Sequence, residues 1–321
     1  MEPYLEVAKS YQQFVEYSAG DSPCFEEWAA GVVGDVEVQE WISQLPRVKQ
    51  QPNLVFAAAR WHGVLAPGPY DDLRAALLGD DGTIRQTILT RSTQTNEAGR
   101  LATLMPAFAQ LEGPLALLEV GASAGLCLYP DRYDYRWDPA GELRTGAGPL
   151  LTCTVEGPVP VPTAPLDVIW RGGIDRNPLD VHDADAMTWL TNLVWPEQDD
   201  RRALLTQAIE VARPEPPVLI RGDLFDALPD ALAEAGRHGT PVVFHSAVIA
   251  YLQPDDRERF HDLMTGLVAD GACRWVSNEG DTVLPRIAAT GPRHDGVTFV
   301  LGLDGRAVAW THGHGRTMTW F

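Results

Sequence analysis

One stretch of this chain, residues 115–126, constrains the possible fold more than any other. Its sequence is Leu-Ala-Leu-Leu-Glu-Val-Gly-Ala-Ser-Ala-Gly-Leu, and five of the first six residues are apolar. A strand that is buried on both faces has this composition. The small residues and two glycines that follow allow a sharp turn and a close approach to a ligand or a packed neighbour. We therefore predict a buried strand, a tight turn at 121–125 and then the start of a helix.

Two features of this turn point to a bound ligand. Glu119 puts a carboxylate at the end of the predicted strand, where it can accept hydrogen bonds from hydroxyl groups. The start of the predicted helix would present free backbone N–H groups at the same place. The candidate ligand contacts of the turn are Glu119, Gly121, Ala122, Ser123 and Gly125.

Residues 1–112 carry helical patterns and no strand pattern. Ser22 before Pro23, Asp35 and Pro52 are typical helix starts, and the spacing predicts helices over 36–45, 52–63 and 70–78. We therefore predict an all-helical N-terminal region at 1–112, followed by a second domain at 113–321.

A polar cluster, formed by Asn96, Glu97 and Arg100, comes shortly before residue 115. One interpretation is a capped helix start, with Glu97 favourable at the positive end of the helix dipole. The other is a set of ligand contacts next to the glycine turn, since loops that lead to the edge of an open sheet often carry function. The sequence leaves both open.

Strand patterns dominate the chain after the glycine turn. Aromatic residues alternate with charged ones over 133–138 and end at Asp138, about where a nucleotide-binding unit has its ribose-binding acid. The alternative for Asp138 is a turn aspartate. Further strands are expected at 217–221, 241–248 and 272–277, and a hairpin around Asp304 and Gly305. This order predicts an α/β fold with a Rossmann-like, mainly parallel sheet and a C-terminal antiparallel hairpin.

Residues 139–216 interrupt this alternation and are predicted to be an insertion. The insertion begins with a glycine- and proline-rich segment, and a short strand at 166–170 leads into a polar turn with Arg171 and Asp175. Two helices, at 184–195 and 197–213, complete it. They form either a lid over a substrate or a packing addition.

When the insertion is left out, the order of the predicted strands and helices in residues 115–321 resembles that of a class I S-adenosylmethionine-dependent methyltransferase. The spacing Glu119-x-Gly121-x-x-x-Gly125 resembles motif I of that family, in which Ser123 replaces a frequent middle glycine. The resemblance implies S-adenosylmethionine as cofactor, with Glu119 near its methionine or ribose part. It further implies that the later strand ends contact the ribose and adenine, at Asp138, Asp223, Leu224 and Ser246. The alternative for Asp223 is a helix N-cap.

The wider chain also resembles an uncharacterised bacterial family, domain-of-unknown-function family 2332. Four motifs carry this resemblance: Glu-Val-Gly-Ala-Ser-Ala-Gly-Leu at 119–126, Asp-Arg-Tyr at 131–133, Thr-Asn-Glu-x-x-Arg at 95–100 and Val-Trp-Pro-Glu at 194–197. This resemblance implies no known activity.

A methyl acceptor would need its own contacts, and three polar clusters could supply them. The candidates are Asn96, Glu97, Arg100, Arg171, Asp175, His245 and Tyr251. We expect the clusters to converge, with the helices at 184–213 as a cover. His245 would be the general base because its unperturbed pKa lies near neutrality, with Tyr251 as the second catalytic candidate. The arginines favour a small anionic acceptor. Alternatively, each cluster only caps helices and pairs charges locally.

Two other functions remain open at this stage. Gly121-x-Ser123-x-Gly125 matches the nucleophile elbow of α/β-hydrolases, which would need an acid and a histidine later in the chain. Asp223 with His294, or Asp281 with His312, could complete such a triad. The other possibility is a protein that binds an adenosyl ligand without catalysis.

The composition and charge of the chain limit the kinds of binding partner, metal site and cellular compartment that are expected. The formal net charge of −19 disfavours nucleic acids and anionic membranes, so a small-molecule substrate is expected. The four cysteines form no Cys-x-x-Cys pair, and no acid or cysteine lies near His312 and His314 in the sequence, so no metal site is expected. No segment has the pattern of a signal peptide or a membrane span, which favours a cytoplasmic protein. The oligomeric state is left undetermined.

Overall fold

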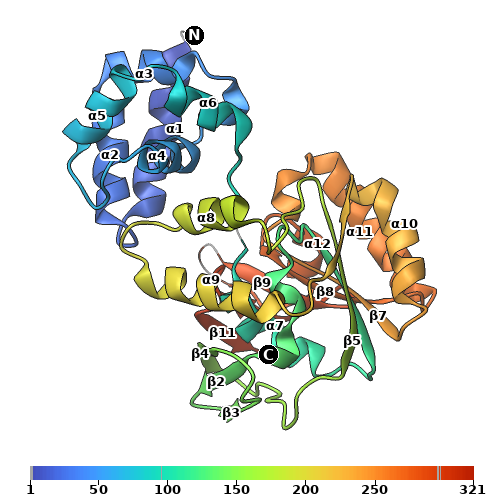
Figure 1. Ribbon diagram of the computed structural model, residues 1–321. Coiled ribbons are helices and arrows are strands. Elements are labelled where there is room, and N and C mark those ends of the chain that lie inside the picture. Colours follow the sequence, from blue (N-terminus) through green and yellow to red (C-terminus); the bar gives the residue numbers. More distant parts are fainter. Residues whose placement is uncertain (1–2, 95, 295, 297) are drawn as a thin grey trace. The chain divides into compact units, whose positions relative to one another are not determined.

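The computed structural model describes residues 3–94, 96–294, 296 and 298–321 (Figure 1). The chain divides into two compact units. The helical unit consists of Met1–Thr95 and Ala184–Ala203, and the sheet unit consists of Asn96–Asp183 and Leu204–Phe321.

The helical unit is built from short helices that start at the capping residues seen in the sequence. Ser22 caps α2 by accepting from the Phe25 N–H, and Asp35 caps α3 by accepting from the N–H groups of Glu37 and Val38. The α-helices of the unit are α1 (Pro3–Ser18), α2 (Pro23–Gly34), α3 (Val36–Ser43), α4 (Pro52–Trp61), α5 (Tyr70–Leu78), α6 (Thr83–Thr90) and α8 (Ala184–Asn192). A 3₁₀ turn, η1 (Arg47–Lys49), lies between α3 and α4. The prediction that this region is helical is confirmed. The helix α6 was not predicted from the sequence.

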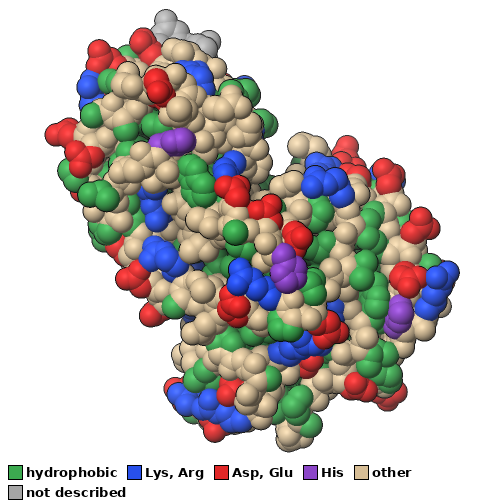
Figure 2. Space-filling model, in the orientation of Figure 1, with side chains coloured by type: hydrophobic (Ala, Val, Ile, Leu, Met, Phe, Trp, Pro, Cys, Tyr) green, Lys and Arg blue, Asp and Glu red, His purple; other side chains and the backbone are tan. Residues whose placement is uncertain are grey.

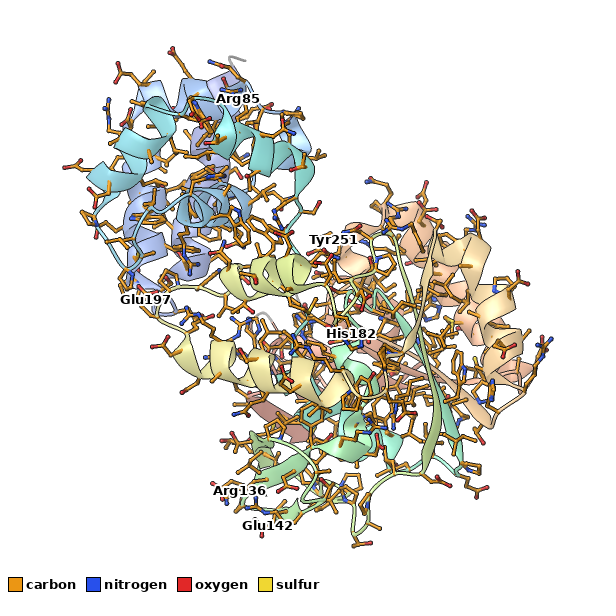
Figure 3. All side chains as sticks on the ribbon, in the orientation of Figure 1. Arg85, Arg136, Glu142, His182, Glu197 and Tyr251 are labelled. Carbon is orange, nitrogen blue, oxygen red and sulfur yellow. The ribbon has the colours of Figure 1, made fainter. Side chains whose placement is uncertain are left out.

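Aromatic side chains fill the core of the helical unit. Phe25, Trp28, Phe56 and Trp195 are buried and pack together, with the Phe25 and Phe56 ring centroids 5.1 Å apart. Glu197, which Figure 3 labels, accepts hydrogen bonds from the Ser22 hydroxyl and the Cys24 N–H at the start of α2. The segment at 184–203 is therefore part of the packing of the N-terminal helices, which accounts for its Val-Trp-Pro-Glu motif.

The sheet unit has one large mixed sheet. Its strands in chain order are β1 (Leu115–Val120), β2 (Asp134–Asp138), β3 (Gly141–Leu143), β4 (Leu150–Glu156), β5 (Val168–Asp175), β6 (Val218–Arg221), β7 (Thr240–Ser246), β8 (Arg274–Gly280), β9 (Phe299–Leu303), β10 (Arg306–Thr311) and β11 (Thr317–Trp320). Across the sheet the described strands lie in the order β3-β2-β4-β11-β10-β9-β8-β7-β1-β5-β6.

Parallel pairing dominates one half of this sheet and mixed pairing the other. β6, β5, β1, β7 and β8 are all parallel, and β9, β10 and β11 follow with antiparallel pairings. The expected α/β architecture with a mostly parallel sheet is confirmed. The hairpin β9–β10 turns at Asp304 and Gly305, both with positive φ, as the sequence predicted.

Helices cover both faces of the parallel half. One face packs against α7 (Leu101–Phe108), where the rings of Phe108 and Phe244 lie 5.2 Å apart. Side chains of the opposite face, including Leu118 and Val243, form a core with α10 (Leu224–Ala235) and α11 (Pro254–Ala269). Both helices are drawn in orange in Figure 1. The unit also contains the short α12 (Pro285–Ala288), and α9 (Asp199–Ala212) runs across the boundary between the two units.

The segment after the glycine turn differs from the expected helix. β1 is followed by two 3₁₀ turns, η3 (Leu126–Leu128) and η4 (Pro130–Arg132), and then by β2. Pro130 has no N–H to donate, and it disfavours a helical conformation at Tyr129. An α-helix that started at 126 could therefore not continue, and the expected N-terminal N–H groups of a helix are absent from this part of the structure.

Candidate functional site

The order of the parallel strands defines where this sheet can bind a ligand. After β1 the chain builds β5 and β6 on one side, and it later builds β7 and β8 on the other side. Open α/β sheets bind ligands at the carboxyl ends of the strands where the order reverses in this way. In this protein that edge is formed by the ends of β1, β5, β6 and β7, all within the sheet unit.

The glycine turn is packed against protein. The N–H groups of Gly121 and Ala122 donate to the Ile174 carbonyl, and the Ser123 N–H donates to Asp175 Oδ2 at 2.8 Å. Gly121 has φ +74, and a Cβ at this position would overlap the side chain of Val248. The sequence analysis expected free N–H groups at this turn. The N–H groups of Gly121, Ala122 and Ser123 are not free, because Ile174 and Asp175 of β5 accept hydrogen bonds from them.

Two buried polar atoms at the turn have no hydrogen-bond partner among the described residues. They are Oε2 of Glu119 and Oγ of Ser123, in side chains that are 5% and 4% exposed. Burial raises the pKa of Glu119, the positive charge of Arg100 opposes this shift, and Asp175 adds to it. Because an unpaired buried polar atom is costly, two of them within five residues of the chain indicate a place for a polar ligand.

The polar cluster before β1 does lie next to the glycine turn. Asn96 Oδ1 accepts from the Leu126 N–H at 2.9 Å, and the Cys127 thiol donates to the Glu97 carbonyl. The 3₁₀ turn η2 (Ala98–Arg100) then leads into α7. The cluster thus lies next to the glycine turn and holds the turn that carries Ser123, while its role in ligand contact stays a prediction.

Arg100 connects this cluster to the end of β7. Its Nε donates to the Gly313 carbonyl at 2.8 Å, and its Nη1 donates to the Ser246 carbonyl at 2.9 Å. Arg100 is only 9% exposed, and no described carboxylate lies within salt-bridge distance of it. A buried positive charge thus lies at the candidate edge with neutral carbonyl partners.

Two further acids follow the ends of the neighbouring strands. Asp175 ends β5, directly beside β1, where its Oδ1 accepts from the Asn177 N–H. Asp223 follows β6, caps α10 through the Phe225 N–H and pairs with Arg176 at 2.6 Å. The hydrogen bonds from Arg176 and Phe225 hold the pKa of Asp223 below its ordinary value. Asp223 is thus the helix N-cap that the sequence analysis gave as its alternative, and its contact with adenine stays a prediction.

Asp138 is not at this edge. Six strands lie between β1 and β2 in the described sheet, and three of the pairings between them are antiparallel. An odd number of antiparallel pairings makes β2 run opposite to β1, so its carboxyl end lies at the other edge of the sheet. The strands that do end beside β1 are β5 and β7, and β5 ends in an acid, Asp175.

His245 is buried on the other face of the sheet from Glu119. Glu119 is in register with Phe244, which contacts α7, whereas the next side chain, His245, contacts Phe260 of α11. His245 Nε2 accepts from the indole N–H of Trp275, so its proton is on Nδ1 and is donated to a carboxylate, Glu279 Oε1, at 2.8 Å. Both ring nitrogens are occupied, and the expected role as general base is not supported.

Glu279, which sequence reasoning passed over, organises the end of β7. Its Oε1 also accepts from the N–H groups of Val248 and Ile249, and its Oε2 is a third buried oxygen without a described partner. The signal in the sequence was an acid at the end of the predicted strand at 272–277. Glu279 thus holds the loop that packs Val248 against Gly121.

Arg171 and Tyr251 do not join the other candidates. Arg171 lies inside β5, where it pairs with Asp131 at 2.7 Å and donates to the Leu128 carbonyl at 2.6 Å. These contacts fix the segment after the glycine turn. Tyr251, labelled in Figure 3, is 80% exposed in the turn η5 (Ile249–Tyr251). The expected convergence of three clusters on one site therefore does not occur.

The remaining candidates have packing roles at the edge. Ser246 Oγ accepts from the Asn278 amide at 3.3 Å, and Leu224 lies partly buried at the start of α10. Ala122 is buried against Gly173. These residues shape the surroundings of Glu119 and Ser123.

The structure provides no triad around Ser123. The residue has the positive φ of a nucleophile elbow, 52°, yet no described histidine lies within hydrogen-bond distance of its Oγ. No α-helix follows it, and its side chain is buried rather than presented to solvent. The geometry favours a packed turn over a reactive serine.

Neither a metal site nor a membrane-spanning helix is found among the described residues. Among the residues that the structure describes, no group of three or more histidine, cysteine, aspartate or glutamate side chains could hold a metal ion. His314 instead lies 3.5 Å from Glu97. None of the described helices combines the length and the apolar character needed to cross a bilayer.

A cavity lies at the opposite, amino end of β1. It is lined by Gly113, Leu115 and the segment 160–167, with Asp167 as its charged residue. The acids and the buried arginine described above lie at the carboxyl ends of the strands, so this cavity is separate from the candidate site.

Comparison with known proteins places the chain in a family. Neither the curated proteins nor the solved structures gave a match. A family model described as "Uncharacterized protein conserved in bacteria (DUF2332)" matches residues 8–320. Because the match spans nearly the whole chain, the protein belongs to this family.

Proposed function

We propose that the protein binds S-adenosylmethionine at the carboxyl ends of β1, β5 and β6 and transfers its methyl group to a small anionic acceptor. One observation carries the proposal: Glu119, Asp175 and Asp223 lie at or just after the carboxyl ends of three adjacent parallel strands, at the side of the sheet where the strand order reverses. Such acids suit the amine and hydroxyl donors of an adenosyl ligand.

Each acid would meet a different part of this ligand. Asp175 would accept from the ribose hydroxyls, the role that the sequence analysis gave to Asp138. Asp223 would accept from the adenine amine, with the apolar Leu224 against the ring. Glu119 and Ser123 would bind near the sulfur and the methionine part, where their unpartnered oxygens gain partners.

The bound ligand would supply an electrophilic methyl group on its positively charged sulfur. The residues around it would orient the two reactants and exclude water. His245 does not remove a proton from the acceptor, because both of its nitrogens are occupied. An anionic acceptor oxygen already carries the electron pair that attacks the methyl group, so it needs no general base.

Two arginines close to Asp223 support the anionic character of the acceptor. Arg221 is the last residue of β6, and Arg259 of α11 lies over the Phe225 ring at 4.0 Å. No described carboxylate lies within salt-bridge distance of either one. Both arginines are exposed. On the face drawn in Figure 2, acidic side chains are scattered over the surface.

Calorimetric titration with S-adenosylmethionine and S-adenosylhomocysteine tests the binding step. We expect binding by the wild type and about 10- to 100-fold weaker binding by Asp175→Asn, the loss of a charged hydrogen bond. Asp138→Asn is the matched control, since it removes a strand-end charge at the other edge and should leave the affinity unchanged. Absence of binding at millimolar ligand by folded wild type would contradict the proposal.

The transfer step needs a separate assay. The protein, incubated with methyl-labelled S-adenosylmethionine and a mixture of small carboxylates and phosphates, should yield a labelled small molecule. Binding without any labelled product from this mixture or from a metabolite extract would leave a protein that holds the ligand without catalysis.

A further inference from the structure

We propose that the cavity at the amino end of β1 binds a small primary amine, with the ammonium group on Asp167 and a short apolar body inside the cavity. The cavity lies in the sheet unit, at the other end of β1 from Glu119. It is therefore a second site, and its test does not depend on the proposed methyl transfer.

The size and the lining of this cavity suit a small organic molecule. Its volume of about 440 Å³ lies in the range of small-molecule sites, roughly 300–1,000 Å³. The side chains of Ala109, Val161 and Leu166 line it and are only half-buried, so they offer apolar surface to a ligand. Leu111 and Leu115, which also line it, belong to the buried core. A ligand with a short apolar body would remove the exposed part of this surface from water.

Asp167 determines the sign of the charge that this cavity attracts. It is the charged residue of the lining, and its side chain is exposed. No residue that the structure describes donates a hydrogen bond to its carboxylate or forms an ion pair with it. An exposed carboxylate in an otherwise uncharged lining favours a cation over a neutral or anionic ligand. The formal net charge of −19 acts in the same direction, because it raises the local concentration of cations.

The wall formed by residues 160–165 favours a ligand that brings its own hydrogen-bond donors. Half of these residues are prolines, which have no N–H group. The Val161 N–H is bonded to the Val159 carbonyl at 2.9 Å. Carbonyl oxygens therefore outnumber N–H groups along this wall. A primary ammonium carries several N–H donors and no acceptor, which matches such a wall and the Asp167 carboxylate beside it.

Two contacts hold this wall in place. The Asp167 carbonyl accepts from the Leu115 N–H at 2.7 Å, at the start of β1. Val161 packs against Gly141 of β3, where an added Cβ would lie 3.3 Å from the Val161 side chain. The wall is thus anchored to β1 and to β3, so a ligand would order little additional chain when it binds.

NMR titrations of the full chain with n-butylamine, n-butanol and butyrate test the charge and the apolar body together. The three probes have carbon chains of the same length and are positive, neutral and negative near neutral pH. We expect n-butylamine to bind about 5-fold more tightly than n-butanol, the effect of one exposed ion pair. Butyrate should bind more weakly than n-butanol, because its charge repels Asp167.

Variants then locate the two parts of the ligand. Asp167→Asn should lower the affinity for n-butylamine to that for n-butanol and leave n-butanol unchanged. Glu112→Gln is the matched control, because it also removes one exposed carboxylate but lies outside the lining, and it should change no affinity by more than about 2-fold. Ala164→Trp, at an exposed position of the lining, should fill the cavity and prevent binding of all three probes.

Several results would overturn the amine site. One is binding of n-butanol or butyrate as tight as that of n-butylamine, and another is no binding of any probe to the folded wild type. Equal losses of n-butylamine affinity in Asp167→Asn and Glu112→Gln would assign the preference to the net charge of the surface instead of Asp167. Should Ala164→Trp not fold, Asp167→Asn and Glu112→Gln decide, since both substitutions preserve the shape of an exposed side chain. None of these results bears on the binding of S-adenosylmethionine at the carboxyl ends of the strands.

Discussion

At the scale of single residues, Glu119 combines a functional position with a cost to stability. Burial raises its pKa in the folded chain, whereas in the unfolded chain the carboxyl group is solvated. The folded state therefore binds this proton more tightly than the unfolded state does. The contribution of Glu119 to the free energy of unfolding then decreases as pH rises above the unfolded-state pKa.

The variant Glu119→Gln removes this titration. We expect its free energy of unfolding, relative to the wild type, to rise between about pH 5 and about pH 8. Urea denaturation at a series of pH values measures the difference. Glu156→Gln, on the exposed side of β4, is the matched control for the loss of a strand carboxylate. A flat profile for Glu119→Gln would mean that Glu119 is solvated in the folded protein.

At the scale of elements, the glycine turn shows what local sequence can and cannot predict. The apolar run and the glycines were sufficient to predict β1 and its turn, because burial on both faces and positive φ impose those residues. The sequence does contain a signal against a long helix after the turn, Pro130, which lacks an N–H and disfavours a helical Tyr129. The pairing of β2 and β4 with β11 depends on contacts far apart in sequence, which no local pattern encodes. For this reason Asp138 was expected beside β1, where the structure has Asp175.

The packing of this turn predicts a large effect of a small substitution. Gly121→Ala adds a methyl group at φ +74 that overlaps the Val248 side chain, and we expect a loss of more than about 2 kcal/mol in urea denaturation. Gly20→Ala is the matched control, because Gly20 has φ +78 and free space around it, so it should lose only about 1 kcal/mol. Adding Val248→Ala to Gly121→Ala should restore part of the stability. Equal losses of unfolding free energy at Gly20 and Gly121 would show that the overlap with Val248 does not destabilise the fold.

At the scale of the whole molecule, the proposed ligand contacts and the Val-Trp-Pro-Glu segment belong to different units. The residues proposed to hold the adenosyl ligand, among them Glu119, Asp175 and Asp223, all belong to the sheet unit. The Val-Trp-Pro-Glu segment belongs to the helical unit, where Trp195 packs in the core and Glu197 caps α2. The sequence analysis expected the helices at 184–213 to be either a lid or a packing addition, and residues 184–203 of this segment pack within the helical unit.

This division predicts that damage to the helical unit spares ligand affinity. Trp195→Ala removes a side chain that is 8% exposed, and we expect it to lower the stability of the helical unit by about 3–5 kcal/mol. Below the unfolding temperature of the variant, its affinity for S-adenosylhomocysteine should stay within about 3-fold of the wild type, because no proposed ligand contact comes from that unit. Thermal unfolding and calorimetric titration of the same samples measure the two effects. If the variant keeps a folded sheet unit but loses ligand binding, the helical unit contributes directly to the site, and the ligand contacts must be reassigned to include it.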